Sequence, residues 1–264
     1  MKIGIVGCAG RMGRMLIQEV LATAGAELAG GVEPSGPAVG QDLGALVGAK
    51  PVRIAVGTDS RALFAASDAV IDFTTPAATK AHAELAASLG KALIIGTTGL
   101  NDDVRATIAA AARKSVVVQA PNFSIGVNVL LALTEKLAGT LGPDYDIDIL
   151  EMHHRHKVDA PSGTALGLGE SAAKGRKVAL KDVARATRDG QVGARPLGEI
   201  GFATLRGGDV IGDHSVIFAG DGERVELTHK ASSREIFAKG AVRAALWTAG
   251  RKPGLYSMRD VLGL

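Results

Sequence analysis

Short apolar runs rich in β-branched residues alternate with Ala-rich amphipathic stretches over about the first 120 residues of the chain. This alternation is typical of repeated βα units, in which crossover helices make successive strands parallel. The expected strands are Ile3–Val6, Glu27–Val32, Val52–Val56, Ala69–Asp72, Ala92–Ile95 and Val116–Gln119. The expected helices are Gly13–Ala24, Ser60–Ala66, Pro76–Leu89 (capped by Thr75 and Gly90) and Asp102–Arg113, while Pro34–Pro51 is expected to be a long loop with one weak helical turn. We therefore predict an α/β fold with a Rossmann-like, doubly wound parallel sheet.

The pattern of predicted elements changes after Asn122, where strands begin to follow one another without helices between them. The expected elements are helices Val127–Leu141 and Ser162–Gly175 and strands Tyr145–Met152, Ile200–Leu205, Asp213–Phe218 and Arg224–His229. This pattern predicts a second, α+β domain with a mixed or antiparallel sheet. The S-x-x-E pattern from Ser232 to Glu235 predicts the start of a closing helix that runs to Trp247 and packs back onto the first domain. The predicted boundaries are 1–124, 125–233 and 234–264.

The first strand leads directly into three glycines, Gly7, Gly10 and Gly13, which form the pattern G-x-x-G-x-x-G. This differs from the dinucleotide fingerprint G-x-G-x-x-G, because Ala9 occupies the second glycine position. The context supports dinucleotide binding, since the loop opens a helix and Glu33 stands at the tip of the second strand, twenty residues beyond Gly13. Small residues allow a pyrophosphate to approach the backbone, and the Glu33 carboxylate can accept hydrogen bonds from a ribose. The alternative is an ordinary glycine turn followed by a surface glutamate.

Composition excludes several classes of function. The formal net charge is only +3, without a basic run, and aromatic residues make up 3% of the chain, so we expect no nucleic-acid partner. No apolar run is long enough to span a bilayer, and Ile3–Val6 is too short for a signal-peptide core, so we expect no membrane association. The single cysteine, Cys8, permits no disulfide within the chain and favours the cytoplasm. No His or Asp is spaced to form a thiol dyad with Cys8, so a covalent mechanism is not favoured.

A second cluster joins two kinds of chemistry in one segment. The run from Glu151 to Lys157 carries His153, His154 and His156, which can exchange protons near neutral pH. It is followed by the turn Pro161–Thr164, where a new helix offers N–H groups to an anion. Strand alternation would separate His153 from the other two histidines, and no cysteine joins them, so we predict no metal site. The alternative is a solvated basic strand end. Together, the glycine loop and the segment from Glu151 to Thr164 suggest that an acidic substrate is reduced and protonated.

At these residues the chain resembles the dihydrodipicolinate reductase family, now called 4-hydroxy-tetrahydrodipicolinate reductase. The most specific match is EMHHRHKVDAPSGTAL, residues Glu151–Leu166. Further matches are Gly7–Arg14, Val70–Pro76, Ile95–Gly99, Ala120–Leu130, Ile200–His214, Glu223–Arg234 and Leu255–Leu262. The resemblance therefore extends from one end of the chain to the other.

The resemblance implies NAD(P)H-dependent reduction of a small cyclic dicarboxylate to tetrahydrodipicolinate in lysine and diaminopimelate biosynthesis. Carried over by position, His153 is the acid or base and Lys157 the proton donor. The substrate carboxylates are assigned to His154, Ser162, Gly163 and Thr164. The cofactor is assigned to Gly7, Cys8, Ala9, Gly10, Arg11, Met12, Glu33, Gly96, Thr97, Thr98, Ala120, Pro121, Asn122 and Phe123.

The resemblance also implies that residues 1–124 bind the dinucleotide and that residues 125–233 bind substrate and assemble a homotetramer. In one respect the sequence departs from some relatives, because Pro34 follows Glu33 where they carry a basic residue for the 2′-phosphate of NADPH. We therefore expect both NADH and NADPH as cofactors, with NADH preferred. Arg11 and Arg14 are the cations that remain to contact that phosphate.

Two other classes of function share the first domain. A Rossmann oxidoreductase for another substrate, such as an amino acid or a semialdehyde, would keep Gly7–Gly13 but need not place His153 and Lys157 beside a carboxylate-binding helix. The His154 and Thr164 positions decide between the two. A dinucleotide sensor without catalytic activity would not depend on Lys157. The substitution Lys157→Ala therefore separates the enzyme from the sensor.

Overall fold

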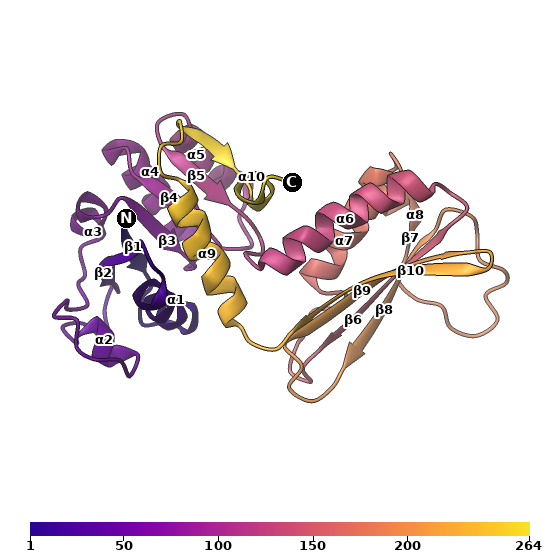
Figure 1. Cartoon of the computed structure of the whole chain (residues 1–264), viewed down its shortest axis with the longest axis horizontal. Helices are drawn as coiled ribbons and strands as arrows, with labels where there is room; N and C mark the ends of the chain where they lie inside the picture. The colour runs from indigo at the N-terminus through magenta and orange to yellow at the C-terminus, as the bar shows by residue number, and fades with distance from the viewer. The chain divides into compact units, whose positions relative to one another are not determined.

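The computed structural model describes residues Met1 to Leu264. The chain divides into two compact units, one made of Met1–Ile125 with Glu235–Gly263 and the other of Gly126–Arg234. The first has a parallel sheet with helices on both faces, and the second has a mixed sheet with helices (Figure 1). The predicted α/β fold class is confirmed. None of the helices is both long enough and apolar enough to cross a membrane.

The six-stranded sheet of the first unit has the order β11-β5-β4-β3-β1-β2, and all its pairs are parallel. Its strands are β1 (Lys2–Val6), β2 (Glu27–Val32), β3 (Ala69–Asp72), β4 (Ala92–Ile95), β5 (Val116–Gln119) and β11 (Gly254–Tyr256). Its helices are α1 (Arg11–Ala22), α2 (Leu43–Leu46), α3 (Ser60–Ala66), α4 (Pro76–Leu89), α5 (Asp102–Ala112), α9 (Glu235–Trp247) and α10 (Met258–Leu262). As predicted, Thr75 caps α4 and Gly90 ends it in the left-handed conformation.

The two faces of this sheet form separate hydrophobic cores because side chains alternate along each strand. Ile71 and Ile94 pack on the face covered by α1 and α9, whereas Val70 and Leu93 pack on the face covered by α3, α4 and α5. The alanines of α9 and its Val242 are fully buried against the first of these cores. In Figure 1 the helix α9 lies along α1, which explains why a segment late in the sequence belongs to the first unit.

The predicted strand Val52–Val56 is wrong. The segment makes a single isolated bridge, Ala55 with Asp42. The Asp42 carboxylate accepts hydrogen bonds from the backbone N–H groups of Val52 at 3.0 Å and Arg53 at 2.6 Å. Arg53 also has a positive φ of 60°, which a β-strand does not allow. A side chain thus uses the N–H groups that strand pairing would need.

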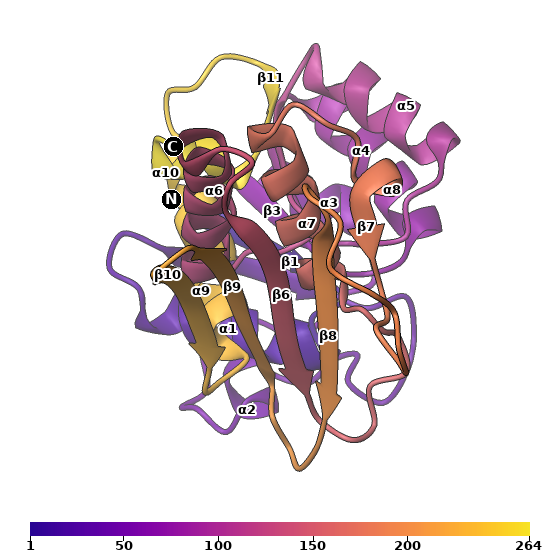
Figure 2. The ribbon, with the colours of Figure 1, turned by 90° about the vertical axis from the view of Figure 1, so that its right-hand side faces the viewer.

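The second unit contains a five-stranded sheet with the order β10-β9-β6-β8-β7. Its strands are β6 (Asp146–His153), β7 (Ala184–Arg185), β8 (Ile200–Arg206), β9 (Gly212–Gly220) and β10 (Glu223–Ala231), and its helices are α6 (Ile125–Leu141), α7 (Gly163–Gly175) and α8 (Leu180–Val183). Figure 2 shows these strands side by side, with α6 and α7 beside the sheet. The pair β6–β8 is parallel because α7 and α8 form the crossover between them, whereas β9 is antiparallel to both β6 and β10.

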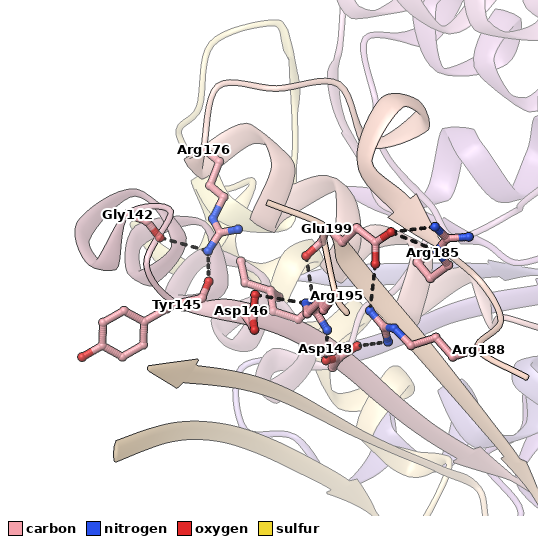
Figure 3. Close-up of polar contacts among 10 residues, drawn as sticks. Gly142, Tyr145, Asp146, Asp148, Arg176, Arg185, Arg188, Arg195 and Glu199 are labelled. Atoms are coloured by element: carbon pink, nitrogen blue, oxygen red, sulfur yellow. Dashed lines mark hydrogen bonds and ion pairs between the residues drawn. The ribbon is translucent and has the colours of Figure 1, made fainter. Parts of the chain in front are cut away.

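A cluster of arginines and carboxylates holds the segment between β7 and β8 to the start of β6 (Figure 3). Arg188 contacts Asp148 at 2.9 Å and Glu199 at 3.2 Å, and Arg195 contacts Asp148 at 2.5 Å. Glu199 also pairs with Arg185 at 2.8 Å. These charges neutralise one another and lie at the opposite end of β6 from His153, so they are separate from the candidate site described below.

Candidate active site

The glycine loop is a tight turn that leads directly into α1. Gly7 has a φ of +66°, a conformation that favours glycine. A Cβ at Gly13 would lie 2.6 Å from the Cα of Cys8, so only glycine fits where α1 approaches the loop. Gly10 is the N-cap of α1, with no side chain capping the helix and no acidic residue in the first turn. The N-terminus of α1 therefore offers its N–H groups and positive dipole end to an anion.

A cavity of about 420 Å³ adjoins this loop within the first unit. It is lined by Val6, Gly7, Gly10, Val32, Glu33, Pro34, Thr58, Ser60, Phe73, Thr74, Thr75, Ala78 and His82. Its mixture of apolar walls and a few polar groups is typical of a small-molecule site. Glu33 Oε1 accepts a hydrogen bond from the Ala9 N–H at 2.6 Å, which ties the end of β2 to the glycine loop.

Cys8 and Arg14 are both occupied by structural contacts. Cys8 is fully buried, and burial together with the nearby Glu33 charge raises the pKa of its thiol to about 12. Cys8 is therefore protonated at neutral pH and is not a nucleophile. The Arg14 guanidinium donates to the backbone oxygens of Ala9 and Leu46, whereas Arg11 is exposed.

The remaining cofactor residues predicted from the sequence lie just beyond the carboxyl ends of β4 and β5. Gly96 donates its N–H to Asp72 O at 2.8 Å, and Ala120 donates its N–H to Ile95 O at 3.1 Å, so the two segments lie beside β3 and β4. Thr97 and Phe123 are buried, and their side chains contact Asp72 and Phe73 respectively. Thr98 and Pro121 are exposed, and Asn122 is half-buried. In doubly wound sheets, ligands bind at this edge.

In the second unit, the carboxylate of Glu151 joins residues that are far apart in the sequence. Glu151 is 1% exposed, and its oxygens contact His153 Nδ1 at 2.6 Å and the Ser162 N–H at 3.0 Å. Arg206, from the end of β8, donates to both oxygens at 2.8 and 2.9 Å. The predicted proton-exchanging run and the predicted anion-binding turn are therefore linked by one buried carboxylate.

These contacts determine the charge of Glu151. Burial alone would raise its pKa, but the hydrogen bonds from Arg206, His153 and the Ser162 N–H outweigh burial and lower it. Glu151 is therefore ionised at neutral pH. An ionised carboxylate only accepts hydrogen bonds, so the Nδ1 of His153 carries a proton and donates it. The Nε2 atom of His153 is then the ring nitrogen that remains for a substrate.

The helix α7 begins at Gly163, and Ser162 is its N-cap, with the Ser162 Oγ accepting from the Ala165 N–H at 3.1 Å. Ser162 is 2% exposed, and its side chain caps the helix. Gly163 is exposed, and a Cβ there would contact nothing within 4 Å. The first turn of α7 contains no acidic residue. Its N-terminus is therefore open to an anion.

Cationic groups lie in the segment that precedes this helix. Lys157 pairs with Asp159, Nζ to Oδ1 at 2.8 Å, and its side chain is 20% exposed. Arg206 also donates to the Asp159 backbone oxygen at 2.6 Å, which holds the loop that carries Lys157. Partial burial and the charges of Arg234, His156, His153 and Lys157 lower the pKa of His154. Such an excess of positive groups suits a substrate with more than one negative charge.

Sequence reasoning missed several residues of these two sites. Asp72 and His82 form a buried pair, Oδ2 to Nδ1 at 2.9 Å, beside the cavity of the first unit. Arg206 and His214 complete the cluster around Glu151, and both belong to strands far from it in sequence. A carboxylate at the carboxyl end of a parallel strand was a usable signal for Asp72. No local pattern marks the other three.

The fold and the two sites together define a Rossmann-type nicotinamide-dependent oxidoreductase. Two family models match the chain: "Dihydrodipicolinate reductase, N-terminus" over residues 1–123 and "Dihydrodipicolinate reductase, C-terminus" over residues 126–262. The chain belongs to the dihydrodipicolinate reductase family. The resemblance predicted from the sequence is confirmed.

Individual relatives agree with this assignment. The chain is 56% identical to the 4-hydroxy-tetrahydrodipicolinate reductase of Methylocella silvestris, with coverage of 100% of this chain and 97% of the relative. It is 54% identical to the enzyme of the same name from Brucella abortus, covering 100% and 99% of the two chains. Among solved structures, the dipicolinate-bound dihydrodipicolinate reductase from Paenisporosarcina sp. TG-14 has the same fold, with a TM-score of 0.79, 24% identity and 98% coverage of both chains.

Proposed function

We propose that the protein reduces 4-hydroxy-tetrahydrodipicolinate to tetrahydrodipicolinate in lysine and diaminopimelate biosynthesis, with NADH as the preferred cofactor. The observation that carries this proposal is the buried Glu151 carboxylate, which connects His153 to the open start of α7. Its relatives carry the name of this reductase, and the Paenisporosarcina structure is named for its bound dipicolinate.

The second unit supplies the groups that bind a dianion. The N–H groups of Gly163 and Thr164 at the start of α7 hold one carboxylate, and the imidazole of His154 holds the other. Ser162 contributes as the cap that keeps this helix start in place. Helix-terminal N–H groups bind a carboxylate without bringing another mobile charge into the site.

The same unit supplies the protons. The 4-hydroxyl group of the substrate is lost as water together with a ring hydrogen, and the nicotinamide cofactor, when bound, would supply a hydride to the unsaturated ring. The Nδ1 of His153 donates to Glu151, which orients the ring and leaves Nε2 to exchange a proton with the substrate. Lys157 leaves its exposed partner Asp159 and donates a proton from Nζ to the ring carbon that becomes basic after reduction. A substrate carboxylate beside His153 or Lys157 stabilises the charged, proton-donating form of that side chain.

The residues of the first unit fit a dinucleotide. Gly7 through Met12 are assigned to the pyrophosphate, because Gly7 and Gly13 allow the loop to lie close against the start of α1, which offers N–H groups. Glu33 is assigned to the adenosine ribose from the wall of the cavity. Gly96, Thr97, Thr98 and residues 120–123 are assigned to the nicotinamide.

We expect kcat/KM to be higher with NADH than with NADPH. Glu33 repels a 2′-phosphate, Pro34 offers no cation, and the Arg14 guanidinium is occupied by backbone oxygens. The substitution Glu33→Gln retains an acceptor for Ala9 and removes the charge, so it should raise kcat/KM for NADPH roughly tenfold, the effect of about 1.4 kcal/mol. The matched control is Glu27→Gln, at the other end of β2, which should change neither value. A wild type that strongly prefers NADPH would contradict this expectation.

The remaining parts of the proposal concern assembly and location. We propose a homotetramer formed through the sheet of the second unit, where β10 is an edge strand of nine residues with open backbone groups. We further propose a cytoplasmic location, in keeping with a biosynthetic enzyme whose single cysteine makes no disulfide. Sedimentation analysis at micromolar concentration tests the tetramer, and a monomer there would contradict it.

A coupled assay tests the reaction. The unstable substrate is generated in place by the synthase that precedes this step, and the loss of NADH absorbance is followed. We expect oxidation of NADH that depends on both enzymes. Equal oxidation without the synthase, or none with it, would refute the proposed reaction.

A further inference from the structure

His214 occupies a position on β9 where an apolar residue is expected. Alternate residues of this strand face the core, and the other two large ones on that face, Val216 and Phe218, are fully buried. His214 is 3% exposed and pairs in register with Glu151 on β6. A polar ring in such a position costs stability unless it makes a specific hydrogen bond. Exceptions of this kind are typical of functional sites.

The contacts of His214 lead to Ser162. The His214 Nε2 lies 3.0 Å from the Ser162 Oγ, and the ring packs edge-on against His153 with centroids 5.1 Å apart. The Nδ1 atom is buried and has no hydrogen-bond partner. Burial, together with the charge of His153, lowers the pKa of His214 to about 4, so the ring is neutral at pH 7. If the ring proton were on Nδ1, His214 would have a buried N–H group without an acceptor. The proton is therefore on Nε2, which donates to Ser162.

Ser162 connects His214 to the start of α7. Its Oγ accepts from both His214 and the Ala165 N–H, which fixes the Ser162 side chain in the capping position. Its backbone N–H is held by Glu151 at the same time. The first turn of α7 is thus fixed from two strands, β6 and β9.

We propose that His214 is a positioning residue for the dicarboxylate substrate. Through Ser162 it keeps the first turn of α7 in the conformation that presents the Gly163 and Thr164 N–H groups to a carboxylate. His214 itself does not contact the substrate. The inference rests on the function proposed above, because it assigns the start of α7 to a substrate carboxylate.

A double-mutant cycle tests this inference. The affinity for dipicolinate is measured by calorimetry with saturating NADH for the wild type, His214→Phe, Ser162→Ala and the double variant. His214→Phe should bind dipicolinate roughly tenfold more weakly, the effect of losing one hydrogen bond, and Ser162→Ala should bind it at least as weakly, because it loses both the bond from His214 and the cap to Ala165. The double variant should bind no more weakly than Ser162→Ala, because His214 acts on α7 only through Ser162. The affinity for NADH alone should be unchanged in all four proteins.

The controls separate positioning from simple stability. Phe218→Leu changes the same face of β9 without touching Ser162 and should lower the unfolding midpoint but not the dipicolinate affinity. His214→Gln keeps a donor near the Nε2 position and should recover part of the affinity, and it carries the test if His214→Phe does not fold. Additive losses in the double variant, or unchanged affinity in His214→Phe, would overturn the role of His214. A wild type that binds no dipicolinate would overturn the proposed function as well.

Discussion

Replacing Lys157 with Ala should lower kcat by roughly 100- to 10,000-fold, the usual contribution of a positioned general acid. Lys157 precedes α7 closely in the sequence. Its Nζ is paired only with Asp159, whose side chain is 54% exposed. Since an exposed pair is weak, the ammonium can exchange Asp159 for a substrate carboxylate at little cost. The affinity for NADH should be unaffected, because Lys157 belongs to the second unit and the proposed cofactor residues belong to the first.

Two further variants make this prediction specific. Lys157→Arg keeps the positive charge but cannot release a proton near neutral pH, so it should restore KM for the substrate without restoring kcat. The matched control is Lys174→Ala, which removes an exposed lysine paired with Glu135 and should change neither constant. Steady-state kinetics in the coupled assay and NADH titration measure these effects. If Lys157→Ala retains kcat within a few-fold of the wild type, Lys157 is not the proton donor.

The parts of the molecule that depend on local sequence could be predicted from it. The glycine loop, the caps of α4 and most βα strands follow from residues close together in the chain. The strand predicted at Val52–Val56 failed because its N–H groups are used by the Asp42 side chain, which no periodicity reveals. The strand β11 was missed because three residues are too few for an alternating pattern. With Ser232 as its N-cap, α9 would begin at Ser233. It begins two residues later, at Glu235.

In the candidate site, too, some residues could be predicted from local sequence and others could not. The run from Glu151 to Thr164 contains both the groups proposed to exchange protons and the helix start, so the proposed chemistry follows from one segment of the sequence. Arg206 and His214 come from β8 and β9, which reach Glu151 only because β6 lies between these strands in the sheet. Their contribution therefore depends on strand order, which a single sequence does not specify.

The substitution Glu151→Gln should be the most damaging change in the second unit. The amide places an N–H₂ group where both carboxylate oxygens now accept from Arg206, His153 and Ser162. Arg206, with a side chain only 20% exposed, would lose its counter-ion. Breaking a buried ion pair on one side costs about 3–5 kcal/mol, and we expect the lower end because Arg206 retains some contact with water. Urea unfolding measures this loss.

The loss of activity should exceed what the loss of stability explains. Without the ionised carboxylate, the proton of His153 is no longer held on Nδ1, so Nε2 is not reliably the exchanging atom. A comparable change of a carboxylate to an amide beside a catalytic histidine costs up to about 10⁴ in kcat, so we expect a fall of at least roughly 100-fold in the folded protein. The matched control is Glu199→Gln, which also removes an arginine-paired carboxylate but at the other end of the sheet (Figure 3). It should lower stability and leave kcat unchanged.

The pH dependence of the stability difference identifies its cause. The pKa of Glu151 is lowered in the folded protein from its ordinary value of 4.5, so its stabilisation is complete above that value and is lost as the pH falls through the lower folded pKa. The difference in unfolding free energy between wild type and Glu151→Gln should therefore be constant from pH 7 to about pH 5 and shrink in more acidic solution. A difference that does not change down to the acid limit would mean that shape, and not the charge of Glu151, holds Arg206, His153 and Ser162 together.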